Sequence, residues 1–90
     1  MIKEISEPVE RRKINPKKEN HLVLYNDDVN TFEFVIETLI EICQHTPEQA
    51  EQCAFIVHFK GKCTVKSGSE NKLEGLCTAL CDRGLSAVIE

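Results

Sequence analysis

Long apolar runs are missing from this sequence of 90 residues. The most apolar stretch, residues 32–43, is interrupted by Glu37 and Glu41, whereas a membrane-spanning helix needs about 20 apolar residues in succession. Residues 1–20 also lack the apolar segment and the small-residue cleavage site of a secretory leader. Because no apolar run is long enough to span a membrane, we expect a soluble protein with no membrane partner. Because the number of cysteines is odd, five in all, and a leader is missing, we expect it in the reducing cytoplasm.

Motifs for metal, phosphate and covalent chemistry are missing as well. The sequence has no Cys-x-x-Cys pair and no glycine-rich phosphate loop, and Cys77 with Cys81, one helical turn apart, supplies too few ligands for a zinc site. Cys53 and His58 are a poor nucleophile and base, because residues i and i+5 of a helix point in different directions. We therefore expect core thiols, no metal, no cofactor and no enzymatic activity.

Positive charge is scarce beyond the first twenty residues. Residues 1–20 carry six Lys or Arg against four Glu, whereas residues 21–90 carry five against eleven Asp or Glu. An acidic body disfavours nucleic acid as a partner. The length suffices for one small domain. Because residues 1–20 contain two prolines and no sustained apolar period, we assign them to a flexible N-terminal arm and residues 21–90 to the core domain.

Periodic apolar residues predict six elements in the core domain. Their order, strand-helix-helix-strand-helix-strand, predicts an α+β fold in which three helices pack on one face of a small three-stranded antiparallel sheet. Turn residues at 67–69 end the second strand. A period of two places the strands at residues 21–25, 62–66 and 85–89, and steps of three and four place the helices at about 30–43, 46–61 and 73–83.

Capping residues mark the ends of the first two helices. Asn30 with Glu33, and Thr46 with Gln49, each match a capping box, in which side chains accept hydrogen bonds from the unpaired N–H groups of the first turn. Gly61 can end the second helix in the left-handed conformation. The first helix is therefore expected to begin at Asn30.

Three short polar residues, Asn26, Asp27 and Asp28, follow the first strand directly. They permit two interpretations. The first is a turn with a helix cap, because Asn and Asp are common turn formers, and the second is a site for a cation. His58 adjoins the apolar stripe of the second helix, where a buried, hydrogen-bonded core histidine is the simpler interpretation and a ligand-binding histidine is the alternative.

Several short motifs together resemble the ClpS family of adaptor proteins. They are Leu24-Tyr25-Asn26-Asp27-Asp28, Phe32-Glu33-Phe34-Val35 where the family has Met-Glu-Phe-Val, Ala50, and Val57-His58 followed by Gly61-Lys62. The resemblance spans about residues 22–66. It implies a non-enzymatic adaptor that binds the destabilising N-terminal residue of a substrate, an N-degron, and delivers the substrate to the N-terminal domain of a Clp AAA+ ATPase and its protease.

The resemblance also assigns roles to single residues. It implies that Asn26, Asp27 and His58 bind the α-amino group of the substrate, and that Asp28 shapes the loop. It further implies a docking site for the unfoldase at Lys72 and Glu70, on a monomeric adaptor. The pocket for a bulky apolar first residue is implied to be lined by Asn30, Phe32, Val35, Ala54, Val57 and Leu85.

The sequence departs from the family pattern around this pocket. Asn30 and Thr31 replace Thr-Pro, Phe32 replaces a gate methionine, and Ala54 stands where a bulky methionine is typical. We expect a pocket that is shorter on one wall and bulkier at its rim. The turn at residues 67–71 is also shorter than in the family. The alternative function is a protein-interaction module of similar fold, like the carboxy-terminal domain of the ribosomal stalk protein, with no pocket for an N-terminal residue.

Overall fold

Three antiparallel strands form the sheet of this protein in the computed structural model, which describes residues 19–90. The central strand pairs with both others, in the order β2-β1-β3. Tyr25, the last residue of the central strand, lies opposite Lys62 and Ser86, the first residues of its neighbours. The loop after the central strand therefore leaves the sheet where both neighbours begin. The strands are β1 (Asn20–Tyr25), β2 (Lys62–Gly68) and β3 (Ser86–Ile89).

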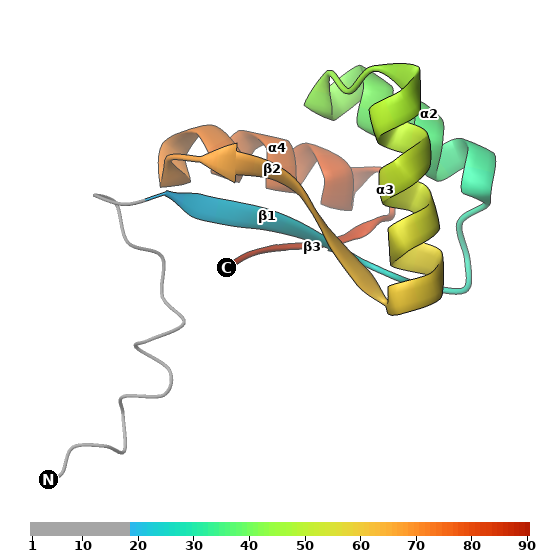
Figure 1. Ribbon diagram of the computed structural model, residues 1–90. Coiled ribbons are helices and arrows are strands. Elements are labelled where there is room, and N and C mark those ends of the chain that lie inside the picture. Colours follow the sequence, from blue (N-terminus) through green and yellow to red (C-terminus); the bar gives the residue numbers. More distant parts are fainter. Residues whose placement is uncertain (1–18) are drawn as a thin grey trace, which may run out of the picture.

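Three helices complete the predicted order, and the predicted α+β fold is confirmed. In Figure 1, α4 runs along the sheet, while α2 and α3 stand together at the end of the sheet where β1 finishes. Leu22 and Leu24 of β1 are fully buried in one core with Leu39, Leu73 and Leu80 of the helices, as expected when one face of the sheet is covered. The helices are α2 (Phe32–Cys43), α3 (Pro47–Lys60) and α4 (Glu70–Asp82).

The start of α2 differs from the prediction. Its cap is Thr31, whose hydroxyl accepts a hydrogen bond of 3.0 Å from the backbone N–H of Phe34. The capping box expected from Asn30 and Glu33 was wrong because the amide of Asn30 donates to Asp27 and to a distant carbonyl instead. The helix therefore begins after a loop whose polar side chains bind one another.

The predicted start and end of α3 are confirmed. Thr46 and Gln49 form a capping box, and each side chain accepts from the other residue's backbone N–H, at 3.1 and 3.0 Å. Gly61 ends the helix with a φ of 97°, and its N–H donates to the carbonyl of Val57. The chain then enters β2 without a spacer.

β2 is longer than predicted, because residues 67 and 68 still pair with β1. Turn-forming residues here continue a strand because a partner strand satisfies their backbone groups. The pairing slips between Leu22 and Val23, where Val65 is the extra residue of a bulge. Lys66 on this strand donates to the carbonyl of Cys43 at 2.9 Å. The bulge thus places Val65 in the core and Lys66 over the end of α2.

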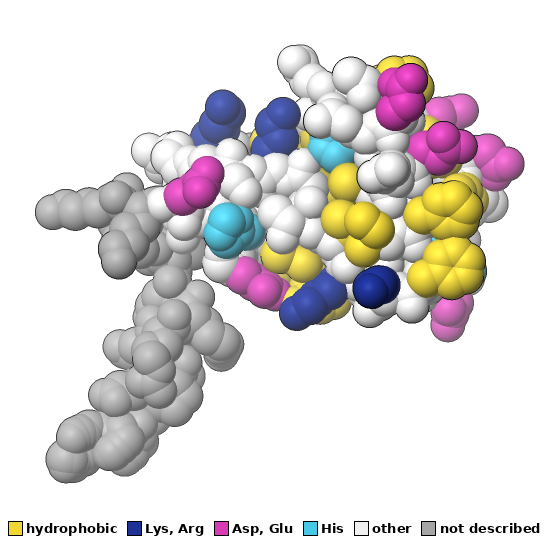
Figure 2. Space-filling view, viewed as in Figure 1, with side chains coloured by type: hydrophobic (Ala, Val, Ile, Leu, Met, Phe, Trp, Pro, Cys, Tyr) yellow, Lys and Arg dark blue, Asp and Glu magenta, His cyan; other side chains and the backbone are white. Residues whose placement is uncertain are grey.

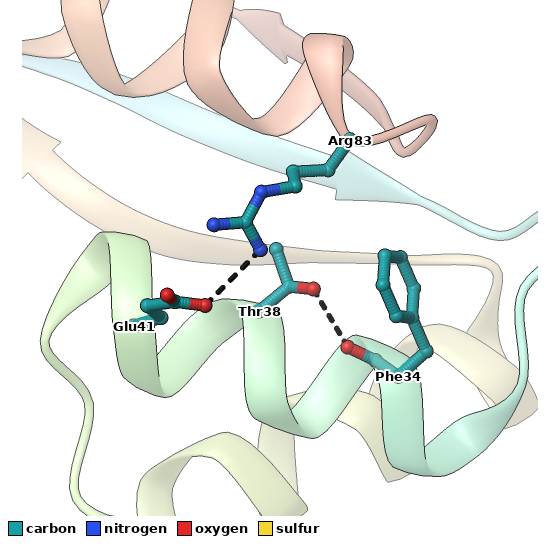
Figure 3. A network of polar contacts seen from close by, with 4 residues as sticks. All are labelled: Phe34, Thr38, Glu41 and Arg83. Carbon is teal, nitrogen blue, oxygen red and sulfur yellow. Dashed lines mark hydrogen bonds and ion pairs between the residues drawn. The ribbon is translucent and has the colours of Figure 1, made fainter.

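One surface ion pair connects α2 to the end of α4. Arg83 Nη1 lies 3.1 Å from Glu41 Oε1, and both side chains are exposed, so the pair contributes at most about 1 kcal/mol (Figure 3). On the inner side of α2, Thr38 is fully buried and its hydroxyl donates to the carbonyl of Phe34 at 2.7 Å. The buried hydroxyl is therefore satisfied within its own helix.

All five cysteines are free thiols. Cys43 is buried, whereas Cys81 is exposed. Burial, helped by a hydrogen bond with Cys63, raises the pKa of the Cys53 thiol to about 12, which makes it a poor nucleophile at neutral pH. Within residues 19–90 no three His, Cys, Asp or Glu side chains are grouped as metal ligands would be.

The predicted arm, residues 1–20, lies outside the described residues except for its last two. Asn20 already belongs to β1 and is 4% exposed, so the first strand begins one residue earlier than predicted. None of the helices described in residues 19–90 has the length and apolar content that crossing a membrane requires.

Candidate functional site

A cavity of about 300 Å³ opens at the end of the sheet where β1 finishes. This volume lies at the lower end of the roughly 300–1,000 Å³ of small-molecule sites, so the cavity can hold one amino-acid residue. Every residue assigned above to the α-amino group, the loop or the pocket lines it. The lining residues are Leu24, Tyr25, Asn26, Asp27, Asp28, Asn30, Phe32, Val35, Ala54, Val57, His58 and Leu85.

The inner wall of the cavity is apolar. Val35 projects from α2, Ala54 and Val57 from α3, and Leu85 from the turn before β3. Ala54, Val57 and Leu85 are each at most 5% exposed, so they belong to the packed core and to the cavity wall at once. A ligand side chain placed against them would lose its contact with water at little cost to the protein.

The outer end of the cavity is polar, and Asp27 organises it. Asp27 Oδ1 accepts hydrogen bonds from the backbone N–H groups of Val29 and Asn30, at 2.9 and 3.0 Å. The Asn30 amide donates to both carboxylate oxygens, at 3.0 and 3.2 Å. Burial raises the pKa of Asp27, but these hydrogen bonds outweigh it and hold the pKa below its ordinary value. The carboxylate is therefore an anion at neutral pH.

Asn30 connects this loop to the turn before β3. Its Nδ2 also donates to the carbonyl of Gly84 at 2.9 Å, which joins residues that are 54 positions apart in the sequence. Gly84 adopts a φ of 91°, in the left-handed region that favours glycine. The amide nitrogen of Asn30 thus holds the Asp27 loop against the turn before β3.

Asn26 and Asp28 leave their side-chain oxygens available. The backbone N–H of Asn26 donates to the carbonyl of Gly61 at 2.9 Å, which fixes the position of Asn26 beside the end of α3. Neither side chain has a hydrogen-bond partner within residues 19–90, and both are exposed. The resemblance assigned loop shaping to Asp28, but the hydrogen bonds that shape this loop are made by Asp27.

His58 is exposed, so the interpretation as a buried core histidine was wrong. Val57 is the last buried position of the α3 stripe, and one further residue turns the side chain by about 100°, out of the core. The ring of His58 packs edge-on against those of Phe32 and Phe59, with centroids 6.2 and 4.8 Å apart. Neither ring nitrogen has a hydrogen-bond partner within residues 19–90, so both face the cavity side or solvent.

Lys72 and Glu70 are not part of this cavity. They lie in the first turn of α4, and only the capping residue Ser69 separates this helix from Gly68, which pairs with Asn20 at the beginning of β1. The cavity lies at the other end of β1, so the two sites are separated by the length of the sheet. Lys72 lines a second cavity with Ile42, Cys43, Gln44, Lys66 and Leu76.

Sequence reasoning missed two kinds of residue around the site. Leu24 and Tyr25 also line the cavity, because β1 ends at its edge. Phe55 and Phe59 lie outside the cavity but contact its rim, and they are 49% and 71% exposed. Their spacing of four residues on α3, opposite the Ala50 and Ala54 stripe, could have indicated a second apolar face.

Comparison with known proteins identifies the family. The family model described as "ATP-dependent Clp protease adaptor protein ClpS" matches residues 15–87, which is most of the chain. The chain belongs to the ClpS family. All the positions that carried the resemblance, from Leu24 to Lys62, lie within the matched region.

Curated relatives named ATP-dependent Clp protease adapter protein ClpS match parts of the chain. The protein of Nitratidesulfovibrio vulgaris is 45% identical over 40 residues, which are 44% of this chain and 40% of the relative. That of Clostridium acetobutylicum is 40% identical over 52 residues, 58% and 52% of the two chains. That of Edwardsiella ictaluri is 36% identical over 61 residues, 68% and 58% of the two chains. The chain thus spans about half the length of these relatives.

A solved ClpS structure has the same fold. The structure of Agrobacterium tumefaciens ClpS2 bound to L-phenylalaninamide matches with a TM-score of 0.78, over 84% of this chain and 98% of that one. The two sequences are 22% identical in this comparison, so the likeness concerns the fold.

Proposed function

We propose that this protein is an adaptor that binds the N-terminal residue of substrate proteins when that residue is bulky and apolar and its amine is unmodified. The observation that carries the proposal is one cavity with acceptors at its outer end and an apolar inner wall. The acceptors belong to the Asn26–Asp28 loop and the wall to Val35, Ala54, Val57 and Leu85. An N-terminal leucine or phenylalanine has the matching pair of groups, an ammonium ion beside an apolar side chain.

The outer end of the cavity suits an ammonium ion. A free α-amino group has a pKa near 8, so it is mostly cationic at neutral pH and carries several N–H donors. Asp27 supplies a fixed negative charge, although its oxygens already accept hydrogen bonds from the loop. Asn26, Asp28 and His58 supply acceptors that have no other partner within residues 19–90. An acetylated terminus has no charge and fewer donors, and we expect it to bind weakly.

The inner wall provides affinity and selects the side chain. Burying a leucine or phenylalanine side chain there stabilises the complex by about 1.5–3 kcal/mol. A charged first residue would lose its hydration without a partner on this wall, which consists of Val35, Ala54, Val57 and Leu85. The ligand named for the solved ClpS2 structure is of the same class, because L-phenylalaninamide is the amide of an apolar amino acid and has a free α-amino group.

The composition of the cavity favours binding over catalysis. Its carboxylate and amide oxygens and its apolar wall match the ammonium ion and the side chain of a bound N-terminal residue, as a binding site requires. We therefore assign it a non-enzymatic role. Delivery to the N-terminal domain of a Clp AAA+ ATPase would use Lys72 and Glu70, which are far enough from the cavity for substrate and unfoldase to bind together. We propose that the adaptor acts as a monomer.

Fluorescence polarisation with a labelled Leu-initiated peptide and its acetylated twin tests the binding proposal. We expect the free peptide to bind and acetylation to weaken binding by about 100-fold or more, because charge-assisted hydrogen bonds of about 1.5–3 kcal/mol each are lost. Asn26→Ala should weaken the free peptide alone. Equal affinities of the two peptides would contradict the proposal and favour an interaction module without a pocket for the N-terminal residue.

A further inference from the structure

The outer face of α3 carries two aromatic residues that the proposed amine site does not use. Phe55 is 49% and Phe59 71% exposed, and their rings stack with centroids 5.4 Å apart. Figure 2 shows hydrophobic side chains gathered over this helix. We call Phe55 and Phe59 the aromatic ridge. Two stacked phenylalanine rings in contact with water form an apolar surface that a ligand side chain can cover.

The aromatic ridge is continuous with the rim of the cavity. The Phe55 ring packs edge-on against Phe32, with centroids 5.3 Å apart, and Phe59 packs edge-on against His58, at 4.8 Å. Phe32 and His58 themselves line the cavity. A ligand that fills the cavity and extends over its rim at these two residues therefore meets the aromatic ridge next.

The proposed binding mode directs the substrate chain toward this rim. The α-carbon of the bound N-terminal residue carries three groups, which are the amine, the side chain and the rest of the polypeptide. The amine is directed to the Asn26–Asp28 loop and the side chain to the wall of Ala54 and Val57. The rest of the polypeptide is taken to leave past Phe32 and the exposed side of the His58 ring, which lie at the rim beside the amine acceptors.

We propose that the aromatic ridge binds the third residue of the substrate and prefers an apolar or aromatic side chain there; this inference rests on the proposed function. In an extended chain successive side chains point to opposite sides, so the third side chain lies on the same side as the first. The rise of about 3.3 Å per residue places it about 6.6 Å beyond the first. A step of this length carries the chain from the cavity over the rim, whose rings lie 5.3 and 4.8 Å from the ridge rings. The second side chain faces solvent.

Three peptides that differ only at positions two and three test this inference. They begin Leu-Ser-Ser, Leu-Phe-Ser and Leu-Ser-Phe, and each has an acetylated twin. We expect Leu-Ser-Phe to bind about 3- to 10-fold more tightly than Leu-Ser-Ser, which is the range of one added aromatic contact. Leu-Phe-Ser should bind like Leu-Ser-Ser, within about twofold, because its phenylalanine points away from the ridge.

Variants locate the preference on the protein. Phe59→Ser should remove the advantage of Leu-Ser-Phe and leave the affinity for Leu-Ser-Ser unchanged, since Phe59 does not line the cavity. At 71% exposure Phe59 contributes little to the packed core, and a thermal melt verifies that the variant is folded. Val88→Thr is the matched control, because Val88 is also exposed, at 47%, but lies on β3 between the inward-facing Ala87 and Ile89.

Each outcome decides between the explanations. If all free peptides bind more tightly than their acetylated twins but the third residue has no effect, the ridge proposal is wrong and the proposed function stands. If no free peptide binds, both are wrong. If Phe59→Ser instead abolishes a concentration-dependent dimer in size-exclusion chromatography and leaves the peptide preference intact, the ridge is an interface between two copies of this chain.

Discussion

Replacing Ala54 by methionine reduces the space in the cavity without removing an amine acceptor. Ala54 lies on α3 in the cavity wall and is 3% exposed. The number of heavy atoms that this substitution adds to the alanine side chain equals the number by which a phenylalanine side chain exceeds a leucine side chain. In a cavity of about 300 Å³, the new side chain therefore occupies the room that an aromatic first residue needs and that a leucine leaves empty.

The expected effect is a change in selectivity. Forcing additional atoms into a filled apolar site costs about 1–3 kcal/mol, which corresponds to about 5- to 150-fold in affinity. In the Ala54→Met variant we expect peptides that begin with Phe or Trp to lose this factor. Peptides that begin with Leu should change by about threefold or less, because the methionine and leucine side chains pack against each other.

Competition by unlabelled peptides in fluorescence polarisation measures this selectivity. The competitors differ only in their first residue, which is Leu, Phe or Trp. Gln52→Met is the matched control, since it adds a methionine to the exposed side of the same helix. Urea unfolding of the variant determines whether the methionine enters the cavity or strains the core. If the folded Ala54→Met variant has the same ratios of affinity for the three peptides as the wild type, the assignment of Ala54 to the pocket is refuted.

Three further predictions concern the loop that holds the acceptors and the end of α3 beside it. Asn30→Ala removes the hydrogen bonds to Asp27 and Gly84 and should lower the free energy of unfolding by about 1–3 kcal/mol. Urea unfolding measures this loss, and Asn71→Ala, at an exposed position on α4, is the control. An unchanged stability would show that these bonds do not hold the loop. The lowered pKa of Asp27 stabilises the fold above the ordinary aspartate pKa of about 3.9, and this contribution is lost as pH falls through the lower folded value. Between about pH 5 and 2 the wild type should therefore lose more stability than Asp27→Asn, and parallel profiles would contradict this. Gly61→Ala places a Cβ at a φ of 97° in otherwise open space, so we expect backbone strain alone to lower the free energy of unfolding by about 1–2 kcal/mol. The loss should appear as a lower melting temperature. An unchanged melting temperature would show that the backbone relaxes.

The elements of the fold could be predicted from the sequence because local chemistry and tertiary packing agree at most positions. The Thr46–Gln49 capping box and the left-handed Gly61 are local features, and both occur as predicted. The start of α2 was predicted wrongly because Asn30 and Thr31 are both good capping residues. The choice depends on the carbonyl of Gly84, which the sequence does not place beside Asn30.

The site was predictable only in part. The Asn26–Asp28 loop was compatible with a plain turn, and periodicity alone placed His58 near the core rather than on the surface. Motif resemblance brought these residues together, and the structure shows that they line the same cavity. Phe55 and Phe59 were missed because α3 has apolar residues on two faces, which obscures the pattern of a single buried stripe.

The most direct test of the central claim is the ¹H–¹⁵N NMR spectrum of the protein during titration with a Leu-initiated peptide. We predict that the largest shifts belong to the amides of residues 26–30, 54–58 and 85, which surround the cavity. The acetylated twin should leave them nearly unchanged. Shifts of equal size with both peptides, or shifts centred on another surface, would contradict the claim that this cavity binds the N-terminal residue of its partner.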